Sequence, residues 1–264
     1  MRNIYICFPE GKHKVLTMSF DDGRVEDRQL VDMFNRYGIR GTFHVNSGIA
    51  AETRVPVSEY RELYRGHDVS CHTCTNPTIA RCPMEQVVEQ ILEDRRSLEA
   101  AVGYPVRGLS YPNGSFSDEI VKALPALGIR YSRTVEETGA FAMPEDFLRW
   151  KATCHYNHNL LELGKEFVSL HKTQYLYMMY VWGHSYEFNI YGNWDVMEEF
   201  CRNCGGRDDI WYATNIEIVD YMEAAGRLQF GAAGNMVYNP SAASVWIEVN
   251  GEKKEIQGGT LLEF

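Results

Sequence analysis

Two adjacent carboxylates, Asp21 and Asp22, follow the apolar run 15–18 and precede Gly23. Burial of two carboxylates at a strand end is costly unless a metal ion, a cationic side chain or a proton compensates them. Neighbouring strand residues point to opposite faces, so both side chains can serve one site only where the strand breaks, and Gly23 permits that break. The same residues are also typical of a turn that caps the following helix. The pair is therefore a candidate for acid–base or metal chemistry.

A second cluster, residues 66–77, offers metal-ligand chemistry at another predicted strand end. It contains His72 and, four residues later, Asn76, which Pro77 keeps from continuing into a helix. A spacing of four brings both side chains to one side of a single turn. Imidazole is a common ligand of zinc, whereas an amide oxygen is a harder and weaker one. Two acidic side chains and this cluster together predict a metal site.

The elements that must position these residues alternate between strand and helix. About seven strand–helix units predict a parallel sheet, closed or nearly closed into a barrel, with the site at the C-terminal ends of the strands. The segments 111–114 and 182–184 also follow predicted strands, so we expect them at the same end. The predicted strands are 15–19, 41–45, 68–71, 106–110, 129–133, 148–152, 175–182 and 210–213, and the predicted helices are 26–37, 58–64, 83–102, 117–127, 159–170, 193–201 and 214–224.

The end of the chain changes character. Segments 245–249 and 254–256, joined by an Asn-Gly turn, are typical of a β-hairpin. We therefore expect an α/β barrel over residues 1–235 and a small β extension over residues 236–264, packed on the same domain.

Composition narrows the class of protein. The 264 residues carry a net charge of −10, which argues against nucleic acid or an anionic membrane as the partner. The apolar stretch at the N-terminus is too short for a signal peptide, and no segment approaches the ~20 apolar residues of a membrane helix. Seven cysteines, an odd number in a chain of this size, are expected to be reduced thiols in a cytoplasmic protein. The sequence predicts no oligomeric state.

Taken together, these segments resemble the polysaccharide deacetylase family, the NodB-homology group also called carbohydrate esterase family 4. The resemblance runs from about residue 15 to residue 224, most of the chain. It implies a distorted (β/α)7 barrel. It also implies an enzyme that removes an acetyl group from an N-acetylated or O-acetylated sugar with one divalent metal, usually zinc, so the expected partner is an acetylated carbohydrate.

The resemblance assigns roles to the first two motifs. Asp21 would be the general base, and Asp22 and His72 would be metal ligands. Asn76 stands where the family has a second histidine, so its amide oxygen would complete the ligand set. This set should hold zinc less tightly than two histidines, or favour another divalent ion.

The third motif is the segment 107–114. By resemblance, Arg107 would orient and ionise Asp21, because a nearby guanidinium lowers the pKa of a carboxyl group. The backbone N–H of Tyr111 would polarise the acyl oxygen, and Tyr111 and Pro112 would contact the substrate.

The fourth motif is weakly kept in residues 146–150, and the fifth is kept in residues 180–184. Asp146 would tune the catalytic histidine and Trp150 would wall the pocket, although a surface carboxylate and a core tryptophan are equally in keeping with the sequence. His184 would be the general acid that protonates the departing amine, and Trp182 would line the acetyl pocket.

Alternatives remain open at this point. His44 and His67 could replace a ligand but are expected to be structural, and His155 and His158 form a rival pair for substrate or metal. Because Asn76 departs from the family pattern, the chain could instead hydrolyse another amide, such as a cyclic imide or ureide. It could also be a carbohydrate-binding relative without catalysis.

Overall fold

The computed structural model describes residues 2–264, and its centre is a nine-stranded sheet in which every strand pair is parallel. The strand order is β7-β6-β5-β4-β3-β2-β9-β8, with β10 also paired to β2. The bounds are β2 (Lys14–Asp21), β3 (Gly41–Val45), β4 (Asp68–Cys71), β5 (Gly108–Ser110), β6 (Tyr131–Glu137), β7 (Trp150–Ala152), β8 (Cys154–His155), β9 (Tyr177–His184) and β10 (Ile210–Tyr212).

The sheet curls until its two ends nearly meet. β7 and β8 stand at opposite ends of the strand order, yet only Thr153 separates them in the chain. The Thr153 N–H donates to the carbonyl of Tyr180 at 2.8 Å, and the Gly139 N–H donates to the carbonyl of Thr153 at 2.9 Å. The predicted nearly closed (β/α) barrel is confirmed.

β2 is the buried strand that positions Asp21. All eight of its residues are buried, and it pairs with β9 over its whole length. Such a strand is covered on both faces, which explains its nearly continuous apolar sequence from Val15 to Phe20. Asp21 is thus carried to the end of the most buried strand of the barrel.

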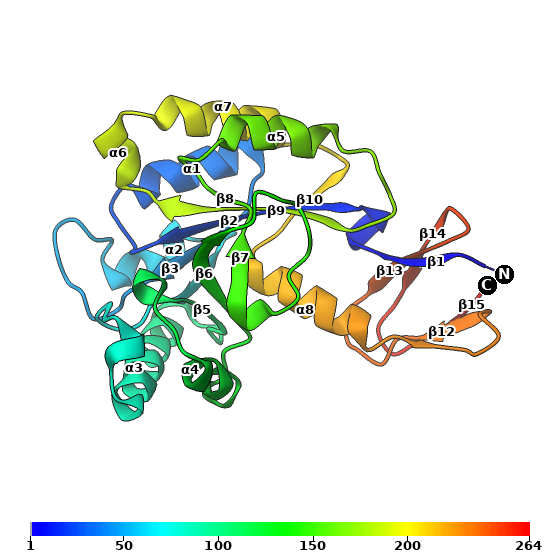
Figure 1. Ribbon diagram of the computed structural model, residues 1–264, viewed down its shortest axis with the longest axis horizontal. Coiled ribbons are helices and arrows are strands. Elements are labelled where there is room, and N and C mark those ends of the chain that lie inside the picture. The colour runs from blue at the N-terminus through cyan, green and yellow to red at the C-terminus, as the bar shows by residue number, and fades with distance from the viewer. Residues whose placement is uncertain (1) are drawn as a thin grey trace.

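Helices cover the outside of the sheet (Figure 1). Two predicted helix ends agree with the caps that are seen: Gly38, at φ +67°, ends the first helix, and Thr214 opens the last with a capping box. The predicted helix 117–127 ends at Ala123 and continues as a 3-10 turn, and the predicted helix 193–201 extends to Cys204. Among residues 2–264, none of the helices is long and apolar enough to cross a membrane. The bounds are α1 (Asp27–Tyr37), α2 (Tyr60–Leu63), α3 (Met84–Val102), α4 (Asp118–Ala123), α5 (Leu160–Ser169), α6 (Glu187–Tyr191), α7 (Trp194–Cys204) and α8 (Asn215–Gly226).

Two small antiparallel sheets stand beside the barrel, where both termini lie (Figure 1). The predicted hairpin is confirmed as β13 (Val245–Val249) and β14 (Glu252–Ile256), and β1 (Ile4–Cys7) pairs with the free edge of β13. The other sheet contains β11 (Gln229–Phe230), β12 (Met236–Tyr238) and β15 (Leu261–Glu263). The domain boundary at residue 235 stays a prediction, and β1 and β11, which precede it in the chain, belong to these two sheets.

Candidate active and metal-binding site

A pocket of about 280 Å³ opens where β2, β4, β5 and β9 end. These strands, together with β3, are consecutive in the sheet, so the loops that follow them meet at one end of the barrel. Seven of the eleven residues that the sequence nominated for the site lie here. The pocket is lined by Asp21, Asp22, His72, Asn76, Tyr111, Asn113, Val135, Trp182, His184 and Tyr186.

The chain breaks between the two carboxylates, as the sequence required. Asp21 is the last residue of β2, whereas Asp22 has φ +83° and Gly23 has φ +63°. This left-handed turn is accessible to aspartate and glycine, and it takes the Asp22 side chain out of the alternation of the strand. The Asp22 N–H donates to the carbonyl of His44 at 2.8 Å, which fixes the turn against β3. Both carboxylates can therefore face one pocket.

Two oxygen atoms in this pocket are buried without a partner. Within residues 2–264, neither Asp22 Oδ1 nor Asn76 Oδ1 has a hydrogen-bond partner. Buried polar atoms are rarely left in this state unless an ion or water occupies the space between them. Asn76 has φ +56°, so the amide is presented from a left-handed turn and not from a helix.

His72 faces the same space. Its Nδ1 lies 3.0 Å from the carbonyl oxygen and 2.6 Å from Oγ of Ser110. A proton on Nδ1 that is shared with Ser110 leaves Nε2 as the atom available to a metal. Nε2 lies 4.0 Å from Asp22 Oδ1. Metal–ligand bonds of about 2.1 Å allow two ligand atoms of one ion to lie up to about 4.2 Å apart. Asp22, His72 and Asn76 thus fit a divalent cation.

Arg54 supplies positive charge beside this ligand set. Its Nη1 donates to the backbone carbonyl of Asp22 and lies 3.5 Å from Asp22 Oδ1. The same nitrogen donates to Asn46 Oδ1 at 3.1 Å. The guanidinium therefore partly balances the charge of Asp22 and holds the left-handed turn in place.

Asp21 is held as an anion by its surroundings. Its side chain is 3% exposed, forms an ion pair with the fully buried Arg133 and accepts a hydrogen bond from Ser110 Oγ at 3.1 Å. Burial raises the pKa of Asp21, but the charge of Arg133 outweighs it and holds the pKa well below its usual value. Asp21 is therefore ionised at any physiological pH.

The prediction for Arg107 is wrong. Arg107 precedes β5, at the end of the strand away from the pocket, and both of its terminal nitrogens pair with Asp220 at 2.7 Å. Ser110, three residues later, is the residue of this segment that reaches Asp21. The expected guanidinium comes from Arg133 on β6, which lies directly opposite Ser110 in the strand register.

His184 is coupled to a carboxylate that the sequence analysis did not nominate. Glu187, at the start of α6, lies 3.5 Å from His184 Nδ1 and 3.1 Å from His155 Nε2, and these three residues form a tight titratable group. Burial lowers the pKa of His184, but the close contact with the Glu187 carboxylate and the charges of Asp21, Glu187 and Asp22 outweigh burial and raise it. The imidazole is therefore biased toward its protonated form.

Trp182 forms a wall of the pocket, as expected, and is 8% exposed. The Arg133 guanidinium lies 4.3 Å from the centre of the indole ring. This cation–π contact fixes the ring and the guanidinium against each other. Trp182 is thus held in one position by the same residue that holds Asp21.

The expected use of the Tyr111 backbone is not supported. The Tyr111 N–H donates to the carbonyl of Arg133 at 2.9 Å, so the extension of the β5–β6 ladder consumes it. Tyr111 still lines the pocket with its side chain, and its hydroxyl donates to the carbonyl of Leu148 at 2.7 Å. Pro112 is buried at the start of a 3-10 turn and does not line the pocket.

The fourth motif is structural. Trp150 is fully buried, and its ring packs against the rings of Tyr131 and Tyr180 in the barrel core, at 5.7 and 4.9 Å between centres. Asp146 caps the 3-10 turn that follows, because its carboxylate accepts the Leu148 N–H at 2.8 Å and pairs with Arg149 at 2.7 Å. Neither residue lines the pocket, so the predicted roles for both are wrong.

The remaining histidines divide between core and surface. His44 is fully buried between Ser19 Oγ and the Tyr131 hydroxyl, and burial lowers its pKa to about 3, so it is neutral. His67 accepts the Gly41 N–H at 3.0 Å, and the expectation that both are structural is confirmed. His158 pairs with Glu137 at the surface, 3.0 Å away.

Sequence signals for the missed residues existed but were ambiguous. Arg133 is a charged residue within a predicted strand, where arginine is rarely buried unless it is paired. Glu187 follows His184 by three residues, a spacing that a helical turn brings together. Arg54 lies in a long loop whose path the sequence does not determine.

Comparison with known proteins agrees with this geometry. The sequence model of the polysaccharide deacetylase family matches residues 9–132, which contain both carboxylates, the His72 segment and the Tyr111 segment. The resemblance to this family is therefore confirmed over residues 9–132. His184 and Arg133 lie beyond the matched part.

The match with individual relatives covers only part of the length of each relative. A chitooligosaccharide deacetylase of Sinorhizobium fredii (strain NBRC 101917 / NGR234) is 26% identical over 48% of this chain and 54% of its own. The peptidoglycan-N-acetylglucosamine deacetylase PgdA of Listeria monocytogenes serotype 1/2a (strain 10403S) is 24% identical over 49% of this chain and 28% of its own. The chain thus spans about half, or less, of the length of these curated relatives.

A solved structure extends the similarity to the whole barrel. A candidate polysaccharide deacetylase from Mycobacterium smegmatis superposes on 84% of this chain and 94% of its own, with a TM-score of 0.63. Sequence identity is 15%, so this similarity concerns the fold. The fold is that of polysaccharide deacetylases, with the pocket at the end of the barrel where the matched motifs lie.

Proposed function

We propose that this chain is a metal-dependent hydrolase that removes an acetyl group from an N-acetylated or O-acetylated sugar. One observation carries the proposal: Asp21, Asp22, His72, Asn76 and His184 come from three different parts of the chain and line one pocket. The orphaned oxygens of Asp22 and Asn76, with His72, would bind a cation, and Asp21 and His184 would serve as a base and an acid.

Asp22, His72 and Asn76 would hold the ion. A divalent cation at this place supplies Lewis-acid polarisation of the acyl carbonyl and lowers the pKa of water. Zinc is the first candidate because of His72, while two oxygen ligands also suit harder divalent ions.

The other residues divide the proton transfers between them. Asp21, kept ionised by Arg133, accepts the proton of the attacking water. His184, whose protonated form Glu187 favours, donates a proton to the leaving amine or alcohol of the sugar. Ser110 connects the proposed base to a proposed metal ligand, because its hydroxyl contacts both Asp21 and His72. Trp182 forms the part of the pocket wall against which the acetyl methyl group would pack.

The substrate class follows from the pocket and from the relatives. The pocket is small and lined mainly by polar side chains, with Trp182 and Tyr186 as aromatic faces of the kind that sugars contact. The relatives named above are deacetylases of chitooligosaccharide and peptidoglycan. We therefore place an acetamido sugar first, and the cytoplasmic location stays a prediction.

Release of acetate from N-acetylglucosamine oligomers and from an acetylated xylan tests the proposal. Chelator-treated protein should be inactive and should recover with added Zn²⁺, Mn²⁺ or Co²⁺. Asp21→Asn should abolish turnover while metal is retained, and the matched variant Asp146→Asn, outside the pocket, should keep it. Turnover of cyclic imides in place of acetylated sugars, or sugar binding without turnover by metal-loaded protein, would contradict the proposal.

A further inference from the structure

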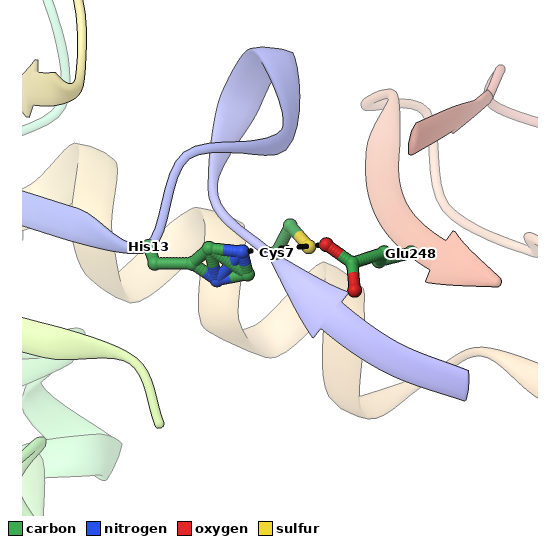
Figure 2. A group of neighbouring side chains, drawn as sticks. All are labelled: Cys7, His13 and Glu248. Carbon is green, nitrogen blue, oxygen red and sulfur yellow. Dashed lines mark ion pairs between the residues drawn. The ribbon is translucent and has the colours of Figure 1, made fainter. Parts of the chain in front are cut away.

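A second group of metal-ligating side chains lies far from the pocket, where the N-terminal strand meets the tail. Cys7 ends β1, Glu248 lies in β13, and His13 lies between a 3-10 turn at Pro9–Gly11 and β2. Their Sγ, imidazole nitrogen and carboxylate oxygen all lie within 4.8 Å of one another. Figure 2 shows the Cys7 sulfur between the His13 ring and the Glu248 carboxylate. Nε2 of His13 and Oε2 of Glu248 are 3.5 Å apart.

Strand register brings Cys7 and Glu248 together. β1 and β13 are antiparallel, and Glu248 lies opposite Tyr5. Because strand side chains alternate, Tyr5, Cys7 and Glu248 point to the same face of this sheet. Cys7 and Glu248 are therefore diagonal neighbours on one face, although they come from opposite ends of the chain.

The turn after β1 returns the chain so that His13 completes the group. The Phe8 N–H donates to the carbonyl of Lys12 at 2.8 Å, and Gly11 has φ +71°. A side chain at Gly11 would collide with the stem of Lys253, so the turn lies close against β14. The Tyr177 N–H donates to the carbonyl of His13 at 2.8 Å and anchors this segment to the barrel.

These side chains are short of other partners. The Cys7 thiol is buried, and its bond to the Tyr5 carbonyl is long, at 3.9 Å. Burial, followed by Glu248, raises the pKa of Cys7 to about 11 against the effect of Lys253, and burial lowers the pKa of His13. The imidazole is thus in its neutral, metal-binding form, and an ion would displace the thiol proton to solvent.

We propose that Cys7, His13 and Glu248 bind one divalent cation of the zinc class and so clamp β1 and β13 to the base of the barrel. One sulfur, one nitrogen and one oxygen ligand suit zinc, which takes a fourth ligand in tetrahedral geometry. His13 also lines a cavity of about 370 Å³ with Gly11, Lys12 and Lys253, so one ligand of the group borders an open space. The site is independent of the proposed active site.

Cobalt substitution distinguishes this site from the active site. A thiolate ligand gives Co²⁺ an intense charge-transfer absorption in the near ultraviolet, and Asp22, His72 and Asn76 contain no sulfur. Titration of the full chain with Co²⁺ should produce this band with the intensity of one thiolate-bound ion per chain, and the band should be complete by two equivalents because the proposed active site also takes Co²⁺. Zn²⁺ should displace it and raise Tm by several degrees, because a ligand that binds only the folded state stabilises it.

Matched variants identify the ligands. Cys7→Ser should abolish the band, Glu248→Gln should weaken Co²⁺ binding at least about tenfold, and Lys253→Gln should strengthen it by removing a nearby positive charge. Cys82→Ser, a free cysteine outside the group, and Asp22→Asn, in the proposed active site, should leave the band unchanged.

The proposal is overturned if the wild-type chain gives no band at tenfold excess of Co²⁺, or if the band survives both Cys7→Ser and Glu248→Gln. If Cys7→Ser does not fold, Glu248→Gln and Lys253→Gln decide the matter, because both change exposed or half-buried side chains. The two readouts distinguish this proposal from the proposed function. A protein that shows the band without acetate release would support this site alone, and a protein that releases acetate without the band would support the proposed function alone.

Discussion

Asp21 and His184 lie directly opposite each other on the paired parallel strands β2 and β9, and each is the last residue of its strand. Their surroundings push their pKa values apart. Arg133 outweighs burial and holds the pKa of Asp21 well below its usual range, whereas Glu187 and Asp21 outweigh burial and raise the pKa of His184. An ionised carboxylate facing a protonated imidazole is the arrangement that a base and an acid need in one pocket.

Arg133 is predicted to be essential for both stability and activity. Arg133→Met leaves the buried Asp21 carboxylate without its counter-charge, which we expect to cost roughly 3–5 kcal/mol of unfolding free energy. The matched variant Arg107→Met removes a half-exposed pair with Asp220 and should cost less than about 1 kcal/mol. Urea unfolding measures both values. Equal effects of the two variants would show that Arg133 does not balance Asp21.

Glu187 is predicted to set the alkaline limb of the pH profile. His184 must be protonated to act as an acid, so activity is lost as pH rises through its pKa. Glu187→Gln removes charge that raises this pKa, so the limb should move to lower pH and activity at pH 8 should fall at least about tenfold. Glu137→Gln, which removes the surface partner of His158, is the control. An unchanged limb would rule out the coupling.

Asn76 is predicted to limit zinc affinity. Asn76→His replaces an amide oxygen by an imidazole nitrogen, and we expect at least about tenfold tighter zinc binding, or about 1.4 kcal/mol. Asn113→His is the matched control, because Asn113 lines the same pocket with the same φ of +56°. Competition with a chromophoric chelator gives both constants. A gain for Asn113→His alone would move the ion away from Asn76.

Asp27 is predicted to contribute a loss of stability as pH rises from 4 toward 7. Burial raises the pKa of Asp27 to about 7, against its hydrogen bonds from Ser185 and Tyr64. The folded chain then keeps a proton that the unfolded chain, with its ordinary value of 3.8, has released. Asp27→Asn removes this contribution, so the variant should gain stability relative to the wild-type chain between pH 5 and pH 8, by at most about 4 kcal/mol. Urea unfolding at both pH values checks this; an unchanged pH slope would contradict it.

Asp68 and Asp94 are expected to contribute to the same pH dependence. Burial raises the pKa of each to about 7, with Ser70 opposing it at Asp68 and Ser47 opposing it at Asp94. The single change at Asp27 should therefore remove only part of the loss of stability that these buried carboxyl groups contribute.

The barrel could be predicted from sequence because its signals are local. Apolar strands, amphipathic helices and capping residues such as Gly38 and Thr214 each lie within a few positions of the element they define. The pocket could be anticipated because polar residues that follow parallel strands meet at one end. Asp21, Asp22 and His72 were found in this way.

The residues that were missed or misplaced depend on pairing between distant strands. Arg133 reaches Asp21 only because β6 pairs with β5 in a register that places it opposite Ser110. The same ladder consumes the Tyr111 N–H that had been expected to serve the substrate. β1 was not predicted, because a strand of four residues is too short to be recognised from its own sequence. It forms by pairing with β13, at the other end of the chain.

The central claim is that a cation is held by Asp22, His72 and Asn76 beside the ionised Asp21. Anomalous diffraction at the zinc edge, from crystals of the full chain grown with Zn²⁺, tests it most directly. The account predicts a peak within bonding distance of Asp22 and His72, with the Asn76 amide oxygen as a third ligand. A peak bonded instead to His155, His184 and Glu187, or no peak in this pocket, would contradict it.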